Sequence, residues 1–372
     1  MDIDELVQTF LALVQIDSVT FEEAAVIEWI GRELASLGLK VVNDGTGRNG
    51  AGNLHVQLAG SLGHLPPLML CAHTDTVEPG RGIRPVIEAG VIHTKGETIL
   101  GGDNKAAVAA TLQALRTIVR AQRPHRDLDV VFTWGEERGH AGSLAFDVAR
   151  LKARIGLTMD DHGAPGTVIV SAPAYCSIHA KFIGKSAHAG AAPEQGVSAI
   201  VAASEAILRM RLGRLDAETT ANVGLIQGGT ARNTVPDRVE IHAEARSRDN
   251  AKLESLVRSL EEAMHSGASQ RGGAVEAAIK REYPAYKYTE RDAVVREVTA
   301  GIRRAGVSPV LGASGGGSDA NTFNEKGIQC LNLGIGMQDV HTTQESIRVE
   351  DLAATCRIAL GLMTSETRSG RD

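Results

Sequence analysis

The chain has few aromatic residues and no excess of basic charge. Phe, Trp and Tyr together make up only 3% of its 372 residues. The core must therefore be built mainly from Val, Ile, Leu and Ala, as the cores of parallel α/β sheets are. The 45 acidic and 39 basic residues give a net charge of −6, and the basic residues are scattered along the chain. This balance argues against a nucleic-acid partner or an anionic membrane surface and favours small solutes.

Cysteines and long apolar runs are scarce as well. The four cysteines are widely spaced and form no Cys-x-x-Cys pair, which is typical of buried free thiols in a reducing cytosol. No apolar run approaches the ~20 residues of a membrane span, and the acidic, amphipathic N-terminus does not look like an export signal. We therefore expect a cytoplasmic protein.

Three common catalytic signatures are missing. The sequence contains no serine nucleophile elbow, no P-loop and no dinucleotide-binding fingerprint. The SGGGS run at 314–318 lacks both the lysine of a P-loop and the spacing of GxGxxG. No such site therefore competes with the histidine and carboxylate motifs described below.

Hydrophobic patterning predicts an α/β fold in two domains. A chain of 372 residues exceeds the ~250 to 300 at which a single core stops growing. Helical spacing covers 4–37, and short apolar strands then alternate with helices up to about residue 170. A smaller αβ mixture interrupts this alternation, which resumes near Arg291. We expect a discontinuous domain, 1–173 and 285–372, with a mostly parallel sheet flanked by helices, and an inserted α+β domain, 174–284.

Histidine and acidic side chains follow four of the strand-like runs. They are His73 after LMLCA, Glu136 and Glu137 after VVFTW, Asp160 and Asp161 after IGLTM, and His341 shortly after CLNLGIG. The carboxyl ends of parallel strands meet at one edge of a sheet, where open α/β sheets bind their ligands. Mixed histidine and carboxylate ligands suit zinc and, less tightly, cobalt or manganese. The pattern therefore predicts a metal site at this edge.

Taken singly, these residues also have purely structural interpretations. His73 could be a satisfied core histidine, although Asp75 shares its face of the strand and could orient the imidazole. Asp103, between two glycines and a helix, is a natural N-cap and is equally suited to bridging two cations. Burying the charged side chains of Glu136 and Glu137 at the end of a buried strand costs free energy unless a cation compensates their charge. One could then bind metal while the other works on a water molecule.

Seven motifs in one order, over nearly the whole chain, resemble the M20 metallopeptidase family and its peptidase T-like branch of tripeptide aminopeptidases. They are AHTDTV, KGETILGGDNKAAVAA, FTWGEERGHAGS, TMD, SAHAGAAPEQGVSAI, GGGSDANTFNEKGI and LGIGMQDVHTTQESI. The resemblance implies a hydrolase with two divalent metal ions, zinc or else cobalt or manganese, that removes the N-terminal residue from short peptides. It also implies that the inserted domain acts as a lid and pairs subunits into a homodimer.

The resemblance assigns the metal ligands by position. His73 and Asp160 would bind one ion, Glu137 and His341 would bind the other, and Asp103 would bridge the two. These five residues include no cysteine.

The same resemblance assigns catalytic and substrate-binding roles. Glu136 would be the general base, Asp75 would orient His73, and His188 would bind the scissile carbonyl oxygen in its own or a partner subunit. Three further residues would bind substrate: Asn233, Arg246 and Gly316. Arg246 is the natural partner of a peptide carboxylate.

Several points stay open at the level of sequence. Asn104 replaces the second acidic residue usual in the family, and Asp161 competes with Asp160 as the ligand. His140 and His162 lie close to ligands in sequence but are not expected to bind metal. The alternative functions are another M20 activity (dipeptidase, carboxypeptidase or N-acyl amino acid deacylase) and a non-catalytic metal-binding protein.

Overall fold

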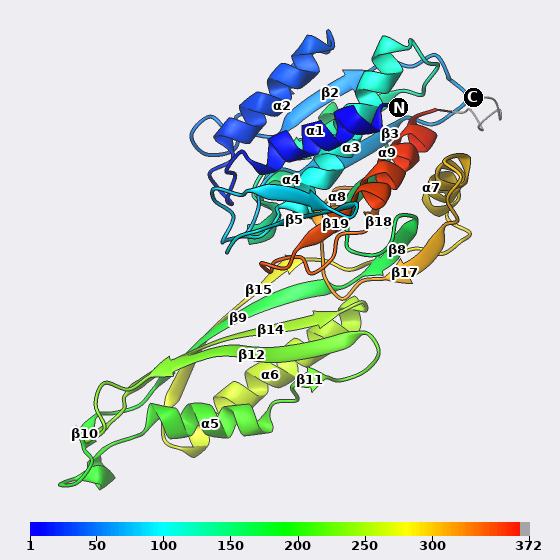
Figure 1. Cartoon of the computed structure of the whole chain (residues 1–372). Coiled ribbons are helices and arrows are strands. Elements are labelled where there is room, and N and C mark those ends of the chain that lie inside the picture. The colour runs from blue at the N-terminus through cyan, green and yellow to red at the C-terminus, as the bar shows by residue number, and fades with distance from the viewer. Residues whose placement is uncertain (365–372) are drawn as a thin grey trace. The chain divides into compact units, whose positions relative to one another are not determined.

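The computed structural model describes residues 1–364 and divides the chain into two compact units (Figure 1). Unit 1 comprises Met1–Val170, Tyr288–Ala313 and the chain from Ser318 onward. Unit 2 comprises Ser171–Lys287 together with Ser314–Gly317. Unit 2 thus starts slightly before the expected residue 174, ends slightly after 284, and includes four residues of the glycine-rich run.

Unit 1 is built on a mixed sheet whose middle strands are parallel. Its strand order is β1-β2-β6-β3-β7-β18-β8-β16, where β16 is Tyr286–Lys287, and β17 also pairs with β8. The strands are β1 Val41–Asn43, β2 Leu54–Leu58, β3 Leu68–His73, β6 Leu128–Thr133, β7 Ile155–Asp161, β8 Thr167–Ala172, β17 Val310–Ala313 and β18 Gln329–Gly334. Strands β6, β3, β7 and β18 run parallel, whereas β1, β2 and β8 are antiparallel to their neighbours. This confirms the predicted α/β class.

The parallel strands are buried on both faces. Every residue of β3 and of β6 is buried, which explains why their sequences are continuous apolar runs rather than alternating ones. The helices of unit 1 are α1 Ile3–Val14, α2 Ala24–Ser36, α3 Gly102–Arg120, α4 Ala141–Ala145, α7 Ala293–Arg304, α8 Asp319–Glu325 and α9 Val349–Met363. Helices α1, α3 and α9 contact one another, α3 packs on β3 and β7, and α8 packs on β18 and β7.

A small antiparallel sheet in unit 1 was not predicted. It consists of β4 Pro85–Glu88, β5 Val91–Thr94 and β19 Ser346–Arg348 in the order β19-β5-β4. These strands are short and mostly half-exposed, so they carry no continuous apolar signal. Two short 3₁₀ helices complete the unit, η1 Glu136–Arg138 and η2 Val148–Arg150.

Unit 2 is an antiparallel sheet with two helices on one face (Figure 1). The strand order is β11-β12-β14-β9-β15, with β9 Ala174–Ile183, β11 Gly213–Arg214, β12 Thr219–Gly228, β14 Arg238–Ser247 and β15 Ala274–Tyr283. Alternate residues of β9 are buried in a core shared with α5 Ala199–Arg209 and α6 Asn250–Gln270. The smaller elements are β10 Ala187–His188, η3 Pro193–Gln195, β13 Thr234–Val235 and β16 Tyr286–Lys287.

Three local differences from the predicted elements have simple causes. The sequence pattern also predicts a helix over 195–212, and the observed helix is shorter because Ser198 caps its start and Met210 is already extended. Strand β15 was missed because it is an edge strand rich in charged, exposed residues. Asp160 and Asp161 were placed after a strand but are its last two residues.

The predicted state of the cysteines is confirmed. All four are free and buried. Within residues 1–364, no helix is both long enough and apolar enough to cross a membrane.

Candidate metal centre and active site

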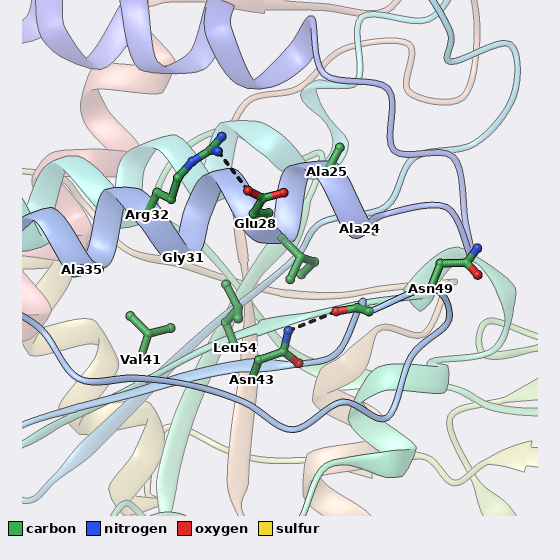
Figure 2. Close-up of a pocket in the computed structure, with 12 residues that line it drawn as sticks. Ala24, Ala25, Glu28, Gly31, Arg32, Ala35, Val41, Asn43, Asn49 and Leu54 are labelled. Carbon is green, nitrogen blue, oxygen red and sulfur yellow. Dashed lines mark hydrogen bonds and ion pairs between the residues drawn. The ribbon is translucent and has the colours of Figure 1, made fainter.

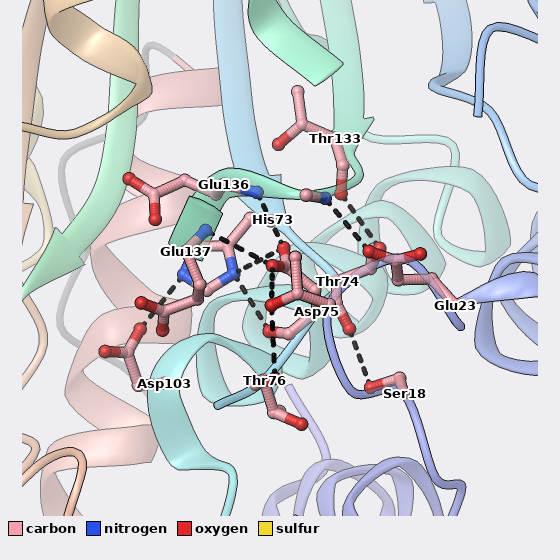
Figure 3. A network of polar contacts seen from close by, with 12 residues as sticks. Ser18, Glu23, His73, Thr74, Asp75, Thr76, Asp103, Thr133, Glu136 and Glu137 are labelled. Atoms are coloured by element: carbon pink, nitrogen blue, oxygen red, sulfur yellow. Dashed lines mark hydrogen bonds and ion pairs between the residues drawn. The ribbon is translucent and has the colours of Figure 1, made fainter. Parts of the chain in front are cut away.

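Five side chains expected as metal ligands meet at the carboxyl edge of the unit 1 sheet. Figure 3 shows three of them, His73, Asp103 and Glu137. Asp103 lies between two histidines: its Oδ1 is 3.0 Å from Nε2 of His73, and its Oδ2 is 3.2 Å from Nε2 of His341. Oδ1 of Asp160 is 3.2 Å from Nε2 of His73, and Oε1 of Glu137 is 3.0 Å from Nε2 of His341. The structure thus contains two three-residue groups that share Asp103, with the ligand atoms of each group within 4.8 Å of one another.

The parallel strands explain why these residues converge. His73 ends β3, Asp160 lies at the end of β7, and Glu137 follows β6 in η1. His341 follows β18, and Asp103 lies in the first turn of α3. Because β6, β3, β7 and β18 are parallel and adjacent, their carboxyl ends deliver these side chains to one edge.

Of the two neighbouring aspartates, the structure directs Asp160 toward His73. Successive side chains of a strand point to opposite faces. Asp161 is buried and accepts a hydrogen bond of 2.8 Å from the N–H of Gly163. Among residues 1–364, Asp161 belongs to none of the three-ligand groups.

The side chain of Asp103 does not cap its helix. Asp103 and Asn104 have non-helical backbone angles within α3, and the Asp103 carboxylate faces the two histidines instead. Glu345 supports this turn, because its two oxygens accept hydrogen bonds from the N–H of Gly101 at 2.8 Å and of Asp103 at 2.9 Å. Burial of Glu345 raises its pKa to about 7. The sequence reasoning did not single out Glu345, although it is an acid four residues after His341.

Asp75 contacts the ring of His73 and the backbone N–H groups of Glu136 and Glu137. Nδ1 of His73 lies 3.0 Å from the backbone oxygen of Asp75 and 3.3 Å from its carboxylate. With Nδ1 facing these acceptors, Nε2 keeps its lone pair for a metal. The Asp75 carboxylate also accepts hydrogen bonds from the N–H of Glu136 at 2.9 Å and of Glu137 at 3.2 Å. The sequence did not predict the hydrogen bonds from the backbone of Glu136 and Glu137 to Asp75.

Glu136 is buried beside the ligands and contacts a histidine. Its exposed fraction is 8%, and its Oε1 lies 3.4 Å from Nε2 of His140. Nδ1 of His140 lies 3.2 Å from the hydroxyl of Thr322. Burial, followed by the negative charge of Asp160, raises the pKa of Glu136 well above its usual value. His140 thus contacts Glu136, the candidate general base. Within residues 1–364, neither His140 nor the exposed His162 belongs to a group of three possible metal ligands.

The electrostatics of the centre favour bound cations. Burial raises the pKa of Asp160 well above its usual value, although His73 lowers it, and the nearby carboxylate of Asp103 raises it further. Hydrogen bonds with Asp103 and then Glu137 raise the pKa of His341 to about 10, so this pair of carboxylates strongly favours a positive charge. Two imidazoles with three carboxylates form a donor set that suits zinc-type divalent ions. The residues present fit a two-ion centre.

The expected carbonyl-binding residue, His188, lies in unit 2 on β10. Its side chain is exposed, and its Nδ1 accepts hydrogen bonds from the N–H of Gly190 at 3.2 Å and of Ala191 at 3.0 Å. Because Nδ1 accepts, the neutral ring carries its proton on Nε2. His188 thus presents an N–H donor.

The three expected substrate-binding residues also lie in unit 2. The backbone oxygen of Asn233 accepts a hydrogen bond of 3.0 Å from the N–H of Ala189, which places Asn233 next to the β10 turn. Arg246 stacks over the ring of Tyr175 at 4.6 Å and forms an ion pair with Glu244 at 3.0 Å. The N–H of Gly316 donates to the hydroxyl of Ser314. Glu244 and Tyr175, which hold Arg246 in place, were not predicted.

A hollow elsewhere in unit 1 is separate from this chemistry. It measures about 690 Å³ and lies between α2 and the β1-β2 segment (Figure 2). Its lining is largely apolar or small, with an ion pair of 2.9 Å between Arg32 and Glu28. None of the candidate site residues lines it, so we do not assign the active site there.

Known proteins resemble this chain over nearly its whole length. Residues 171–271 match the family described as "Peptidase dimerisation domain". The uncharacterized protein YqjE of Bacillus subtilis is 40% identical over 361 residues, which are 96% of this chain and 97% of that protein. The solved aminopeptidase PepT of Bacillus cereus is 40% identical with a TM-score of 0.91, covering 98% of each chain. A solved tripeptidase of Staphylococcus aureus is 37% identical with a TM-score of 0.94, covering 99% of this chain and 100% of that one.

The fold, the paired ligand groups and these relatives together define a metal-dependent hydrolase. The chain belongs to the M20 family of metallopeptidases, in its peptidase T-like branch. The resemblance inferred from the seven sequence motifs is thereby confirmed.

Proposed function

We propose that this chain is a di-metal aminopeptidase that releases the N-terminal residue of tripeptides. The observation that carries the proposal is the position of Asp103 between two pairs of ligands, His73 with Asp160 and Glu137 with His341. The identities of its relatives, an aminopeptidase and a tripeptidase, support this reaction and substrate class. Zinc is the proposed metal, with cobalt or manganese as alternatives.

Two ions held by His73, Asp160, Asp103, Glu137 and His341 would polarise the peptide carbonyl and lower the pKa of a water molecule. Glu136 accepts the proton of that water as it attacks the peptide carbonyl, and returns the proton to the leaving amine. His140, which contacts both Glu136 and Thr322, would fix the direction of the carboxylate. Nε2–H of His188 would donate to the carbonyl oxygen as negative charge develops there.

Arg246 is the proposed partner of the substrate carboxylate. Stacking on Tyr175 limits the rotamers of the side chain, so less conformational entropy is lost when the guanidinium binds substrate. Glu244 already neutralises part of its charge, so a substrate carboxylate must share Arg246 with Glu244. Asn233 and Gly316 are proposed to contact the peptide backbone.

A panel of peptides tests the proposed reaction. We expect free tripeptides to lose their N-terminal residue, with lower kcat/KM for dipeptides and for tripeptides acetylated at the N-terminus. Mass spectrometry of the products identifies which bond is cut. Preferential hydrolysis of the N-acylated substrates would instead make the protein a deacylase, and absence of turnover in metal-loaded protein would favour a binding role.

Replacement of His188 tests the carbonyl-binding role. His188→Ala should lower kcat while the metal content stays that of wild type, because His188 belongs to unit 2 and the ligands to unit 1. Removing one such donor typically costs ~10² to 10³ in kcat. His188→Gln, which keeps an N–H donor, should recover part of the loss. Wild-type kcat in His188→Ala would show that the role does not belong to this residue.

We further propose a homodimer formed through unit 2 and a cytoplasmic location. The match of 171–271 to a dimerisation domain supports the homodimer. The four free, buried cysteines support a reducing compartment.

A further inference from the structure

Two histidines and a glutamate gather on the face of the unit 2 sheet that α5 and α6 leave uncovered. His179 on β9 lies directly opposite His242 on β14, and the two rings stack with centroids 4.4 Å apart and planes inclined by 17°. Glu240 lies two residues before His242 and therefore shares its face of the strand. Its Oε2 lies 3.6 Å from Nε2 of His179. One ligand atom from each of the three residues lies within 4.8 Å of the others.

The surroundings leave these side chains available to a ligand. Both histidines are exposed and Glu240 is half-buried. The 3.6 Å contact between His179 and Glu240 is longer than a hydrogen bond. Lys181, which lies opposite Glu240 in the register, has its Nζ 3.6 Å from Glu276 on the other neighbouring strand, β15. The ammonium group of Lys181 thus contacts a carboxylate on β15.

We propose that His179, Glu240 and His242 form a metal site separate from the catalytic centre. Two imidazole nitrogens and one carboxylate oxygen form a three-ligand set of the kind that binds zinc with a fourth position open to water. Such a set selects borderline transition-metal dications over Mg²⁺ and Ca²⁺, which require oxygen ligands. The bound ion would link β9 to β14.

The geometry requires only side-chain movement to close around the ion. Zinc–nitrogen distances of ~2.0 to 2.1 Å in tetrahedral geometry place ligand atoms roughly 3.3 to 3.5 Å apart. The present separations are all within 4.8 Å. Because the two rings are stacked with planes only 17° apart, the rings must also turn so that a nitrogen of each points at the ion. The paired backbone of β9 and β14 holds the two histidines opposite each other throughout.

The test counts zinc on the whole chain. Wild type is dialysed to equilibrium against ZnCl₂ and its zinc is measured by inductively coupled plasma mass spectrometry. We expect the double variant His179→Gln/His242→Gln to bind one zinc fewer than wild type and to keep its peptidase activity. His265→Gln is the matched control, because His265 is an exposed histidine on α6 of the same unit, and it should bind as much zinc as wild type. Excess MgCl₂ should not displace the additional ion.

Equal zinc content in wild type and in the double variant would overturn the proposal. So would an equal loss of zinc in His265→Gln, which would indicate scattered surface binding. Because the readout is a difference of one ion between two proteins, it does not depend on how many ions unit 1 holds or on whether the peptidase assignment is correct.

Discussion

Glu136→Gln should lose at least the ~10² to 10⁴ in kcat typical of a general base while both ions stay bound. An amide cannot accept a proton, yet it preserves the shape of the side chain. The N–H of Glu136, which Asp75 holds at 2.9 Å, is unchanged by the substitution. The metal content of the variant should therefore equal that of wild type, and added zinc should not restore activity. Steady-state kinetics and metal analysis on the same sample provide both readouts.

The neighbouring Glu137→Gln is the matched comparison. Glu137 contacts His341 within a ligand group, so its replacement by a neutral amide should weaken ion binding. Its activity should be partly restored by excess metal. If metal analysis finds Glu136→Gln empty and Glu137→Gln fully loaded but inactive, the roles of the two glutamates are exchanged.

Asp103→Asn should weaken the binding of both metal ions at once. Each of its oxygens lies within 3.2 Å of a different histidine, so both groups lose their shared negative charge in this variant. The loss of metal affinity should exceed the ~10- to 100-fold typical of removing a residue outside the ligand shell. Hydrolysis should fall with metal content, as it should in wild type treated with a chelator, and should return when zinc, cobalt or manganese is restored in excess.

Asp161→Asn is the control for this substitution. Asp161 is a buried aspartate at the end of the same strand as Asp160, and its carboxylate accepts from Gly163. We expect its metal content to equal that of wild type. Loss of metal in Asp161→Asn together with full loading of Asp103→Asn would contradict the ligand assignment.

The sequence could predict that the candidate metal ligands meet, because their meeting follows from the topology of the sheet. Four strand-like runs ended in histidine or carboxylate, and parallel strands bring such ends to one edge. The choice of Asp160 over Asp161 rested on the family resemblance, and the structure points the same side chain at His73. The sequence thus predicted the fold class and the group of residues that meet, whereas their roles stay proposals.

The supporting contacts could not be predicted, because they depend on the path of loops. Glu345 reaches the turn at Asp103 from far along the chain, and no local pattern indicates that pairing. His140 was considered only as a neighbour of metal ligands, but the 3₁₀ turn after β6 directs it to Glu136. The edge strand β15 was missed for a related reason, since exposed charged positions hide its alternation.

The most direct test of the account is anomalous scattering from a zinc-loaded crystal, measured at the zinc absorption edge. We expect two strong peaks in unit 1, roughly 3.5 to 4 Å apart as in other two-metal sites. One should lie between His73 and Asp160, the other between Glu137 and His341, and an oxygen of Asp103 should bind each. A single peak in unit 1, or two peaks of which one lacks Asp103 as a ligand, would contradict the di-metal centre.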